Sequence, residues 1–360
     1  MTNPICVAVT GATGLVGSHL VNYLGAKGYR IIALVHSKGK VDPFKKVWSS
    51  FGVSIREGDV RDQKKLSNTL DGADVVVHAA GVIDPYGSRE HIFTTNVTGT
   101  KNVLLTANQI SAKQFILVSS LSVITGMSDQ YNVTEDAAFQ ICGEAYADSK
   151  VEAEKLVLEE AKDLQSNRFI TAVTIVRPGF IYGPGERAWL PRLINSIASQ
   201  KAMLIDGGNK ETNVIYVENL NKAIESTILN PVSYGQVYNL TDGQKVTKKQ
   251  LFDTISADLS LPYVTKSVPG FLAKFFCELV SNITPILPLK QKMNLARYSR
   301  AAFRLAGLNQ GFSIAKAERE LNYTDRIPFH VGMAATLQSF KCPEPSSPEE
   351  RETATVGNPN

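Results

Sequence analysis

The sequence has few cysteines and no long apolar run, and both shortages narrow the class of protein. Its four cysteines, Cys6, Cys142, Cys277 and Cys342, lie far apart among 360 residues, with no Cys-x-x-Cys and no nearby histidine pair. This spacing indicates neither a zinc site nor a disulfide framework, so we expect no bound metal and a reducing compartment. No stretch reaches the roughly 18 to 20 apolar residues of a membrane-spanning helix. No secretory signal precedes the first apolar run, so we expect a cytoplasmic protein.

An excess of charge of one sign is also missing. The chain has 38 basic and 34 acidic residues, a net charge of +4, and the basic residues are not visibly clustered. We therefore expect no nucleic-acid partner. With 43% hydrophobic and 20% charged residues, the chain can bury the core of one large or two modest domains.

The first half of the chain alternates short β-branched runs with helical patterns, which is typical of an α/β fold with a doubly wound parallel sheet, the Rossmann arrangement. Strands are predicted at 5–9, 30–35, 53–56, 74–78, 114–119 and 171–176, and helices at 14–27, 63–70, 90–109 and 146–163. After Arg177-Pro178 the alternation weakens, and helices are predicted at 190–200, 218–229, 248–259, 314–321 and 330–340. We expect a Rossmann NAD(P)-binding domain over 1–178 and a smaller, mainly substrate-binding region over 179–340, with segments that return to the core. A disordered tail is predicted over 341–360.

A glycine-rich loop predicts where a dinucleotide binds. The segment Thr10-Gly11-Ala12-Thr13-Gly14-Leu15-Val16-Gly17 follows the first predicted strand and opens the first predicted helix. Glycine permits the tight turn and lets the backbone approach a pyrophosphate, whose charge meets the positive end of the helix. We expect the cofactor to contact Gly11, Thr13, Gly14, Leu15, Val16 and Gly17.

An acidic residue is missing where an NAD enzyme usually carries one to bind the adenosine ribose. The second predicted strand ends Leu34-Val35-His36-Ser37-Lys38, and His36, Ser37 and Lys38 are donors that could hold a 2′-phosphate. This end favours NADP(H), while a merely solvated basic exit would leave NAD(H) acceptable. Further along, Asp59 and Val60 could meet the adenine edge. Small residues Ala79, Ala80 and Gly81 follow the fourth strand where it passes the cofactor.

Tyr146 and Lys150 are four positions apart, which places a phenol and an ammonium on one face of a helix. The cation favours phenolate, and we expect it to lower the tyrosine pKa toward working pH, so that Tyr146 can give or take a proton. Surface helices often carry this pair by chance. Together with the glycine loop, however, the pair predicts a nicotinamide oxidoreductase.

Several ordered motifs resemble the extended short-chain dehydrogenase/reductase superfamily over about residues 4 to 340. They are the glycine loop at 10–17, Gly58-Asp59-Val60, His78-Ala79-Ala80-Gly81, Asn96-Val97-x-Gly99-Thr100, Ser119-Ser120, Tyr146-x-x-x-Lys150 and Arg177-Pro178-Gly179-Phe180-Ile181-Tyr182-Gly183-Pro184-Gly185. The resemblance implies that Tyr146 is the general acid/base, that Lys150 holds the nicotinamide ribose, and that Ser120 hydrogen-bonds the substrate oxygen. Ser119 and Ser122 are alternatives to Ser120, which stands three residues before Val123 as in the family pattern.

The resemblance also implies supporting roles for Asn96, structural or in a relay, and for Pro178 beside the cofactor. Nucleotide-sugar epimerases and dehydratases of the superfamily usually place Asn and Arg where this chain has Phe180 and Thr212. Both charge partners for a diphosphate are therefore missing. The 3β-hydroxysteroid dehydrogenase-like branch fits better, through Tyr216-Val217-x-Asn219-Leu220 and the late Phe312-Ser313-x-x-Lys316-Ala317.

This branch implies an enzyme that interconverts a hydroxyl and a ketone on a small apolar, possibly sterol-like, substrate. A nucleotide-sugar epimerase/dehydratase, a dihydroflavonol or aldehyde reductase, and a non-catalytic cofactor-binding sensor remain as alternatives. Phe180 and Tyr182 are candidate substrate contacts. The apolar stripe within 268–289, which includes Phe275 and Phe276, predicts a substrate-covering or core helix, contact with a membrane surface, or a partner interface. The resemblance further implies a homodimer through helices 90–109 and 146–163.

Overall fold

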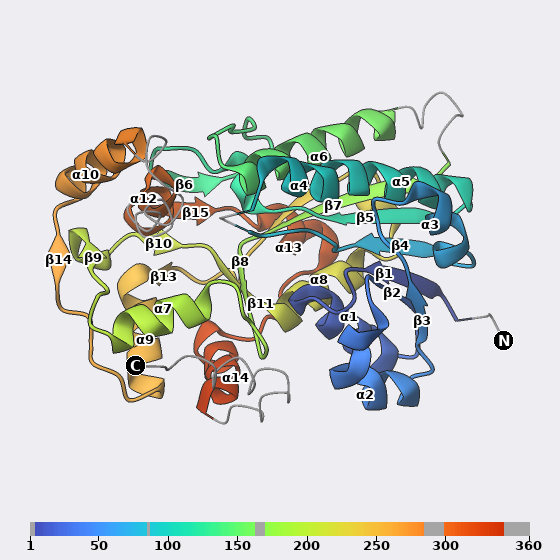
Figure 1. Cartoon of the computed structure of the whole chain (residues 1–360), viewed down its shortest axis with the longest axis horizontal. Helices are drawn as coiled ribbons and strands as arrows, with labels where there is room; N and C mark the ends of the chain where they lie inside the picture. Colours follow the sequence, from blue (N-terminus) through green and yellow to red (C-terminus); the bar gives the residue numbers. More distant parts are fainter. Residues whose placement is uncertain (1–3, 85–86, 163–169, 284–298, 342–360) are drawn as a thin grey trace, which may run out of the picture.

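A seven-stranded parallel sheet forms the centre of the molecule (Figure 1). The computed structural model describes residues 4–84, 87–162, 170–283 and 299–341. The sheet order is β12-β7-β5-β4-β1-β2-β3. Its strands are β1 (Cys6–Thr10), β2 (Arg30–Val35), β3 (Ser54–Glu57), β4 (Val75–His78), β5 (Gln114–Val118), β7 (Ala172–Pro178) and β12 (Val237–Leu240). The α/β doubly wound prediction is confirmed, and the strand order reverses between β1 and β4, where such folds bind their ligands.

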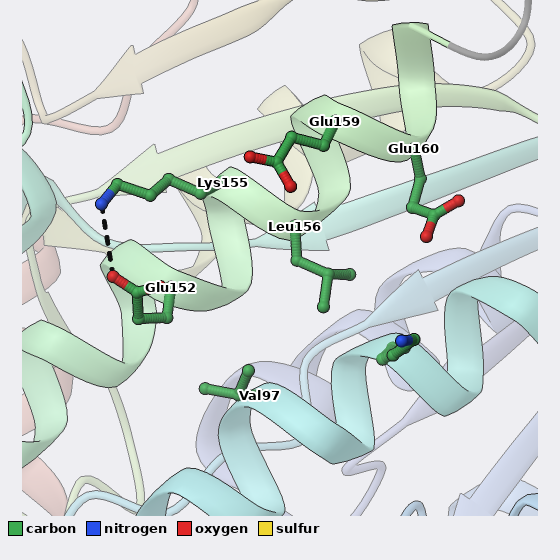
Figure 2. Close-up of a pocket in the computed structure, with 7 residues that line it drawn as sticks. Val97, Glu152, Lys155, Leu156, Glu159 and Glu160 are labelled. Carbon is green, nitrogen blue, oxygen red and sulfur yellow. Dashed lines mark hydrogen bonds and ion pairs between the residues drawn. The ribbon is translucent and has the colours of Figure 1, made fainter.

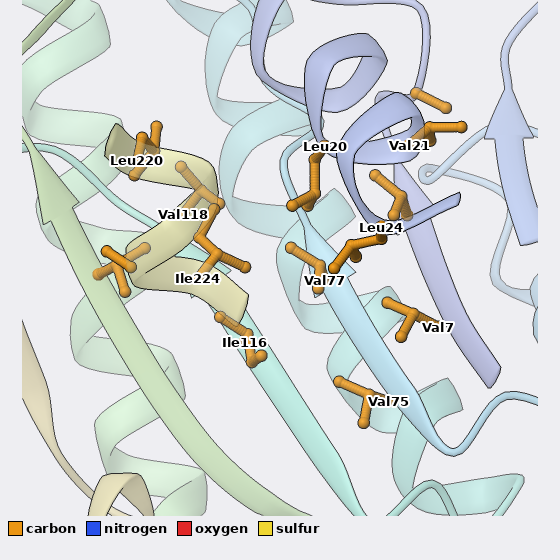
Figure 3. Packing of buried hydrophobic residues seen from close by; sticks show 14 of the residues in the cluster. Val7, Leu20, Val21, Leu24, Val75, Val77, Ile116, Val118, Leu220 and Ile224 are labelled. Atoms are coloured by element: carbon orange, nitrogen blue, oxygen red, sulfur yellow. The ribbon is translucent and has the colours of Figure 1, made fainter. Parts of the chain in front are cut away.

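Helices cover both faces of this sheet because its strands are apolar on both sides. The flanking elements are α1 (Leu15–Ala26), η1 (Lys38–Phe44), α2 (Lys45–Ser50), α3 (Gln63–Leu70), α5 (Gly99–Gln109), α6 (Ala145–Lys162), α8 (Val217–Thr227) and α13 (Ala315–Leu321). Val7 and Val9 pack with Leu20 and Ile224 on one face (Figure 3), while Ala8 packs with the cluster of α3, α5 and α6 on the other. This alternation follows the two-residue period of a strand.

The predicted helix 90–109 is not continuous. It consists of α4 (Arg89–Phe93), a π-helical turn η2 (Thr94–Thr98) and α5. The wide turn coincides with the buried side chain of Asn96, which donates to the carbonyl of Val82 at 3.1 Å and to the Ser149 hydroxyl at 2.9 Å. An interruption of this kind recurs at functional sites, and apolar periodicity alone does not reveal it.

The second half of the chain forms a smaller region beside the carboxyl ends of the strands and returns β12, α8 and α13 to the first. Its remaining strands are β8 (Phe180–Tyr182), β9 (Leu204–Ile205), β10 (Glu211–Thr212), β11 (Val214–Tyr216), β13 (Val246–Thr247), β14 (Ser267–Val268) and β15 (Gln310–Phe312), the last of which pairs with β6 (Gln130–Val133) from the first half. Its helices are α7 (Leu190–Ala198), α9 (Lys248–Asp258), α10 (Gly270–Ile283), α12 (Arg300–Gly307) and α14 (Phe329–Lys341). Short 3₁₀ turns are η3 (Leu121–Ile124), η5 (Asp206–Gly208) and η6 (Pro231–Ser233).

Two sequence predictions concern residues outside the described ranges. The predicted disordered tail lies outside them apart from Lys341, and so does the part of the 268–289 stripe that follows Ile283. In the part of the chain that the structure describes, no helix is long and apolar enough to cross a membrane.

Candidate active site

The glycine loop forms a cradle that only glycine can make. Gly11 has φ +66°, and a Cβ built on it would lie 2.7 Å from the Cα of Ala80. A Cβ on Gly17 would lie 2.2 Å from the carbonyl oxygen of Gly11. Helix α1 begins at Leu15 after an N-cap glycine, Gly14, with no side-chain cap and no acidic residue in its first turn. Its amide groups and positive dipole end therefore suit the pyrophosphate of a dinucleotide.

Basic side chains lie at the end of strand β2, as the sequence predicts, and the structure adds Arg61 to them. Val35 is buried, whereas the His36 side chain is 65% exposed and its Nδ1 lies 3.7 Å from Asp59 Oδ2. Ser37 is the N-cap of the following 3₁₀ helix, which opens with Lys38. Arg61, which the sequence analysis did not single out, donates to the Asp59 carboxylate at 2.5 Å. The Arg61 hydrogen bond lowers the pKa of Asp59 to about 2, so Asp59 is ionised between two basic groups.

A buried histidine at the end of β4 links strand β1 to helix α5. Thr10 Oγ1 lies 2.8 Å from His78 Nδ1, and His78 Nε2 lies 3.0 Å from Thr100 Oγ1. Because the Thr100 hydroxyl donates to the Asn96 carbonyl at 2.6 Å, its oxygen accepts from His78 Nε2–H and Thr10 donates to Nδ1. Burial lowers the pKa of His78 to about 3, and the histidine is neutral. The network orients the turn that holds Ala79, Ala80 and Gly81.

Strand β5 and helix α6 bring the three predicted catalytic residues together. Ser120 follows the end of β5 and accepts from the Ser122 amide at 3.1 Å. Its hydroxyl is close enough to the Tyr146 phenol, near the start of α6, to lower the pKa of that phenol. Lys150, one turn further, is buried and donates from Nζ to the Val118 carbonyl at 2.9 Å. Of the three candidate serines, Ser119 instead donates to Glu154 at 2.5 Å. Ser120 therefore stays the predicted partner of Tyr146, since Ser119 is bound to Glu154.

The expected effect of Lys150 on the tyrosine pKa is not what the structure shows. Burial raises the pKa of Tyr146 to about 12, against a smaller opposite effect of the Ser120 hydrogen bond. Burial also lowers the pKa of Lys150 to about 8, while the charge of Glu154 raises it. The prediction was wrong for this state because loss of hydration disfavours the phenolate and the Lys150 ammonium is bound to a backbone carbonyl. Tyr146 is therefore protonated at neutral pH, ready to donate.

The predicted substrate contacts separate into two groups. Phe180, which follows Pro178 and Gly179, is partly buried against Trp189, with ring centroids 6.1 Å apart. Tyr182 is fully buried and donates to Asp242 at 2.6 Å, so it belongs to the core and does not face a ligand here.

Phe275 and Phe276 are largely exposed among the residues that the structure describes. They lie on α10 and are 69% and 47% exposed. The buried side of α10 is formed by Cys277 and Val280, and a substrate contact of the two rings stays a prediction.

The fold, the glycine cradle and the Ser120, Tyr146 and Lys150 cluster define a nicotinamide-dependent oxidoreductase of the extended short-chain dehydrogenase/reductase type. More narrowly, the chain belongs to the 3-beta hydroxysteroid dehydrogenase/isomerase family, whose model matches residues 8–261. It is 24% identical to a 2-alkyl-3-oxoalkanoate reductase of Shewanella oneidensis, over 90% of this chain and 84% of the relative. It is 27% identical to a sterol-4-alpha-carboxylate 3-dehydrogenase, decarboxylating, of Mus musculus, over 94% of this chain and 93% of that one.

Solved structures share the fold at lower identity. MoeE5 in complex with UDP-glucose and NAD superposes with a TM-score of 0.71 at 19% identity, covering 93% of this chain and 98% of MoeE5. UDP-glucose 4-epimerase of Thermotoga maritima superposes with a TM-score of 0.72 at 18% identity, covering 94% of this chain and 99% of the epimerase. These likenesses show the Rossmann architecture.

Proposed function

We propose that the protein interconverts a hydroxyl and a ketone on a bulky apolar substrate, with NADP(H) as the favoured cofactor. The observation that carries this proposal is that Ser120, Tyr146 and the buried Lys150 lie together at the carboxyl end of β5. A cofactor-binding sensor has no evident need for this arrangement. In the Rossmann fold the same edge of the sheet receives the nicotinamide.

The chemistry divides between the cofactor and the protein. When bound, the nicotinamide supplies or accepts the hydride. In ketone reduction, Ser120 and Tyr146 donate hydrogen bonds to the carbonyl oxygen, and Tyr146 then gives up its proton to that oxygen. The Lys150 ammonium stabilises the phenolate that this leaves. Oxidation of the alcohol runs through the same groups in reverse.

The choice of NADP(H) rests on the end of β2. No acidic side chain follows Val35, and His36, Ser37 and Lys38 present donors at this end. Arg61 adds a second cation at Asp59. A 2′-phosphate carries charge that such donors bind strongly, and NAD(H) lacks this phosphate.

The substrate is proposed to be apolar because the groups that would hold a diphosphate are missing. Phe180 and the buried Thr212 occupy the two positions concerned. An apolar substrate gains roughly 25 cal/mol per Å² of buried surface and needs few polar anchors. The relatives named for oxoalkanoate and sterol carboxylate substrates support testing both of these classes.

A single experiment separates this function from the alternatives. Purified protein is assayed with NADPH and NADH against a sterol ketone, a 2-alkyl-3-oxoalkanoate, a dihydroflavonol and an aliphatic aldehyde, and titrated calorimetrically with UDP-sugars. Turnover of either of the first two supports the proposal. Tight UDP-sugar binding without ketone turnover would instead establish the epimerase/dehydratase alternative, and turnover of only the last two would establish the reductase alternative.

We also propose that α10 rests on an anionic membrane surface. Phe271, Leu272 and Phe275 are 73%, 51% and 69% exposed on this helix. The exposed basic residues Lys266, Lys274 and Arg300 lie on or next to this helix, which has one acidic residue, Glu278. Apolar rings beside an excess of basic charge suit an interfacial helix. Flotation with anionic vesicles tests this, with F271E/F275E as the variant and neutral vesicles as the control.

A homodimer is proposed through the outer face of α5 and α6. Figure 2 shows the hollow on this face, where Lys155 contacts Glu152 at 3.3 Å. The hollow is lined by Val97, Lys101, Glu152, Lys155, Leu156, Glu159 and Glu160. In a twofold interface the lysines of one copy can meet the glutamates of the other. Sedimentation at low and high salt, with E159K as the variant, tests this charge-based pairing.

A further inference from the structure

The last residue of strand β5 and the two residues that follow it each contact a different turn of helix α6. The Val118 carbonyl accepts from Lys150 at 2.9 Å, and Ser119 donates to Glu154 Oε2 at 2.5 Å. The Ser120 hydroxyl is close enough to the Tyr146 phenol to lower the pKa of that phenol. Since Tyr146, Lys150 and Glu154 follow each other at four-residue intervals, they lie on one face of the helix. Glu154 is thus the third member of a row whose first two members are catalytic.

The carboxylate of Glu154 is fully buried and bound through both oxygens. Its Oε1 accepts from Arg177 Nε at 2.8 Å and from Arg177 Nη2 at 2.5 Å, and Oε2 accepts from Ser119. Arg177 also donates to the Glu135 carbonyl at 2.9 Å. Arg177 directly precedes Pro178, so the network joins the ends of β5 and β7 to α6 where the cofactor and substrate are expected to meet.

Fold stability alone gives a weak reason for a buried ion pair here. Removing two charges from water costs several kcal/mol per ion, and apolar side chains of similar volume often serve as well. The nearby charge of Lys150 gives a better reason for burying the Glu154 carboxylate here. Tyr146 and Glu154 lie on the same helix face as Lys150, and Lys150 also acts on neutral His78 of β4. Among these described groups Glu154, which Arg177 of β7 holds in place, is the anion that favours the ammonium.

We propose that Glu154 is a positioning residue for the reaction, which holds Ser119 and thereby the Ser120 backbone in register with Tyr146 and compensates the buried charge of Lys150. Arg177 fixes the carboxylate in place. This inference deepens the proposed function and rests on it. It assigns the buried row a role beyond packing, because loss of the Glu154 charge disfavours the ammonium that stabilises the Tyr146 phenolate.

The test is Glu154→Gln, which keeps the size of the side chain and its capacity to accept from Ser119. The alkaline limb of kcat/KM for ketone reduction is expected to move down by about one pH unit, which is a tenfold loss above that limb. At pH 6 the activity should approach that of the parent. The matched control is Asp242→Asn, which removes another buried carboxylate, bound to Tyr182 and Asn219 and not to the row, and should leave the limb where it is.

A second variant covers the case in which Glu154→Gln does not fold because Arg177 is left unpaired. Glu154→Gln/Arg177→Met removes both charges and should fold, yet its alkaline limb should still lie below that of the parent. If the ion pair had only a structural role, the double variant would regain the pH profile of the parent, and that result would overturn the proposal. So would a folded single variant whose limb has not moved.

Cofactor binding keeps this test separate from the proposed function. Lys150 is expected to hold the nicotinamide ribose, so the pH at which NADPH affinity weakens should shift down in Glu154→Gln, as measured by protein fluorescence without any substrate. If the parent binds NADPH but turns over no ketone, the proposed function fails while this shift still tests Glu154. An unshifted binding profile in a folded variant contradicts the role of Glu154 itself.

Discussion

The two halves of the molecule use buried carboxylates for different ends. In the Rossmann half, Glu154 binds Ser119 and Arg177 next to the catalytic row. In the C-terminal region, Asp242 accepts from Tyr182 at 2.6 Å and from the Asn219 amide at 2.8 Å. Both carboxylates are buried and satisfied by neighbours.

The difference lies in what each carboxylate faces. Glu154 faces two cations, Lys150 and Arg177, whereas the first partners of Asp242 are neutral groups and burial raises its pKa. A charged network that includes a neighbour of the reacting group influences the reaction rate. A network whose carboxylate binds neutral groups mainly stabilises the packing around it. The comparison therefore predicts that changes in the first network alter rates and that changes in the second alter stability.

The largest expected effect is that of Tyr146→Phe, which removes the proton donor of the first network. We expect kcat to fall by about 10² to 10⁴, with NADPH affinity nearly unchanged because the cofactor contacts of Lys150 remain. Steady-state kinetics and a cofactor titration measure the two quantities. Turnover within about tenfold of the parent would remove Tyr146 from the acid/base role.

The next effect concerns cofactor choice. In Val35→Asp, a carboxylate is placed at the end of β2 beside His36, where it repels a 2′-phosphate and can accept from the ribose hydroxyls of NADH. The ratio of kcat/KM for NADPH over NADH should fall by about 10- to 100-fold, or 1.4 to 2.8 kcal/mol. Because Val35 is itself buried, the unfolding transition of Val35→Asp is measured first to show that the variant is folded. The control for a nonspecific effect of charge is Lys40→Asp, because Lys40 is exposed on the adjoining 3₁₀ helix. A parent that prefers NADH contradicts the argument outright.

The pH dependence of ketone reduction is the third prediction. Tyr146, with a pKa of about 12, stays protonated throughout the neutral range. Lys150 has a pKa near 8, below its ordinary value, and loses its charge above that pH. Reduction should therefore be constant from about pH 6 to 8 and fall as pH rises further, tenfold per unit. Folding should show the opposite trend, since the unfolded chain binds this proton more tightly and stability from this group rises with pH above about 8.

The sequence predicted the first half well because its signals are local. Apolar runs such as those around Val7 and Val75 reveal buried strands, and the glycine loop has one structural solution. The catalytic cluster also followed, since Tyr146 and Lys150 are close in sequence and a family pattern selected Ser120. The direction of the Tyr146 pKa shift could not be predicted from the sequence, because it depends on burial that only the assembled fold produces.

The parts that the sequence analysis missed depend on contacts between distant residues. Strand β12 is four residues long and lies far from β7 in the chain, so its pairing through Tyr238 and Val176 has no local signal. Arg61 became apparent only through its contact with Asp59. Glu154 had one usable signal, its four-residue spacing from Lys150, but a glutamate at that spacing is common on exposed helices.

The smallest expected effect is that of Tyr182→Phe, and it provides the sharpest contrast with Tyr146→Phe. Removing the Tyr182 hydroxyl leaves Asp242 without one charge-assisted hydrogen bond, which should lower the free energy of unfolding by about 1.5 to 3 kcal/mol. Turnover should stay within a few-fold of the parent, because Tyr182 is buried away from Tyr146 and bound to Asp242. Denaturant unfolding and kinetics on both variants form a pair: Tyr146→Phe loses rate and keeps stability, and Tyr182→Phe does the reverse. If Tyr182→Phe lost rate as severely as Tyr146→Phe, the two carboxylate networks would not be separable, and the C-terminal region would have to contribute directly to the chemistry.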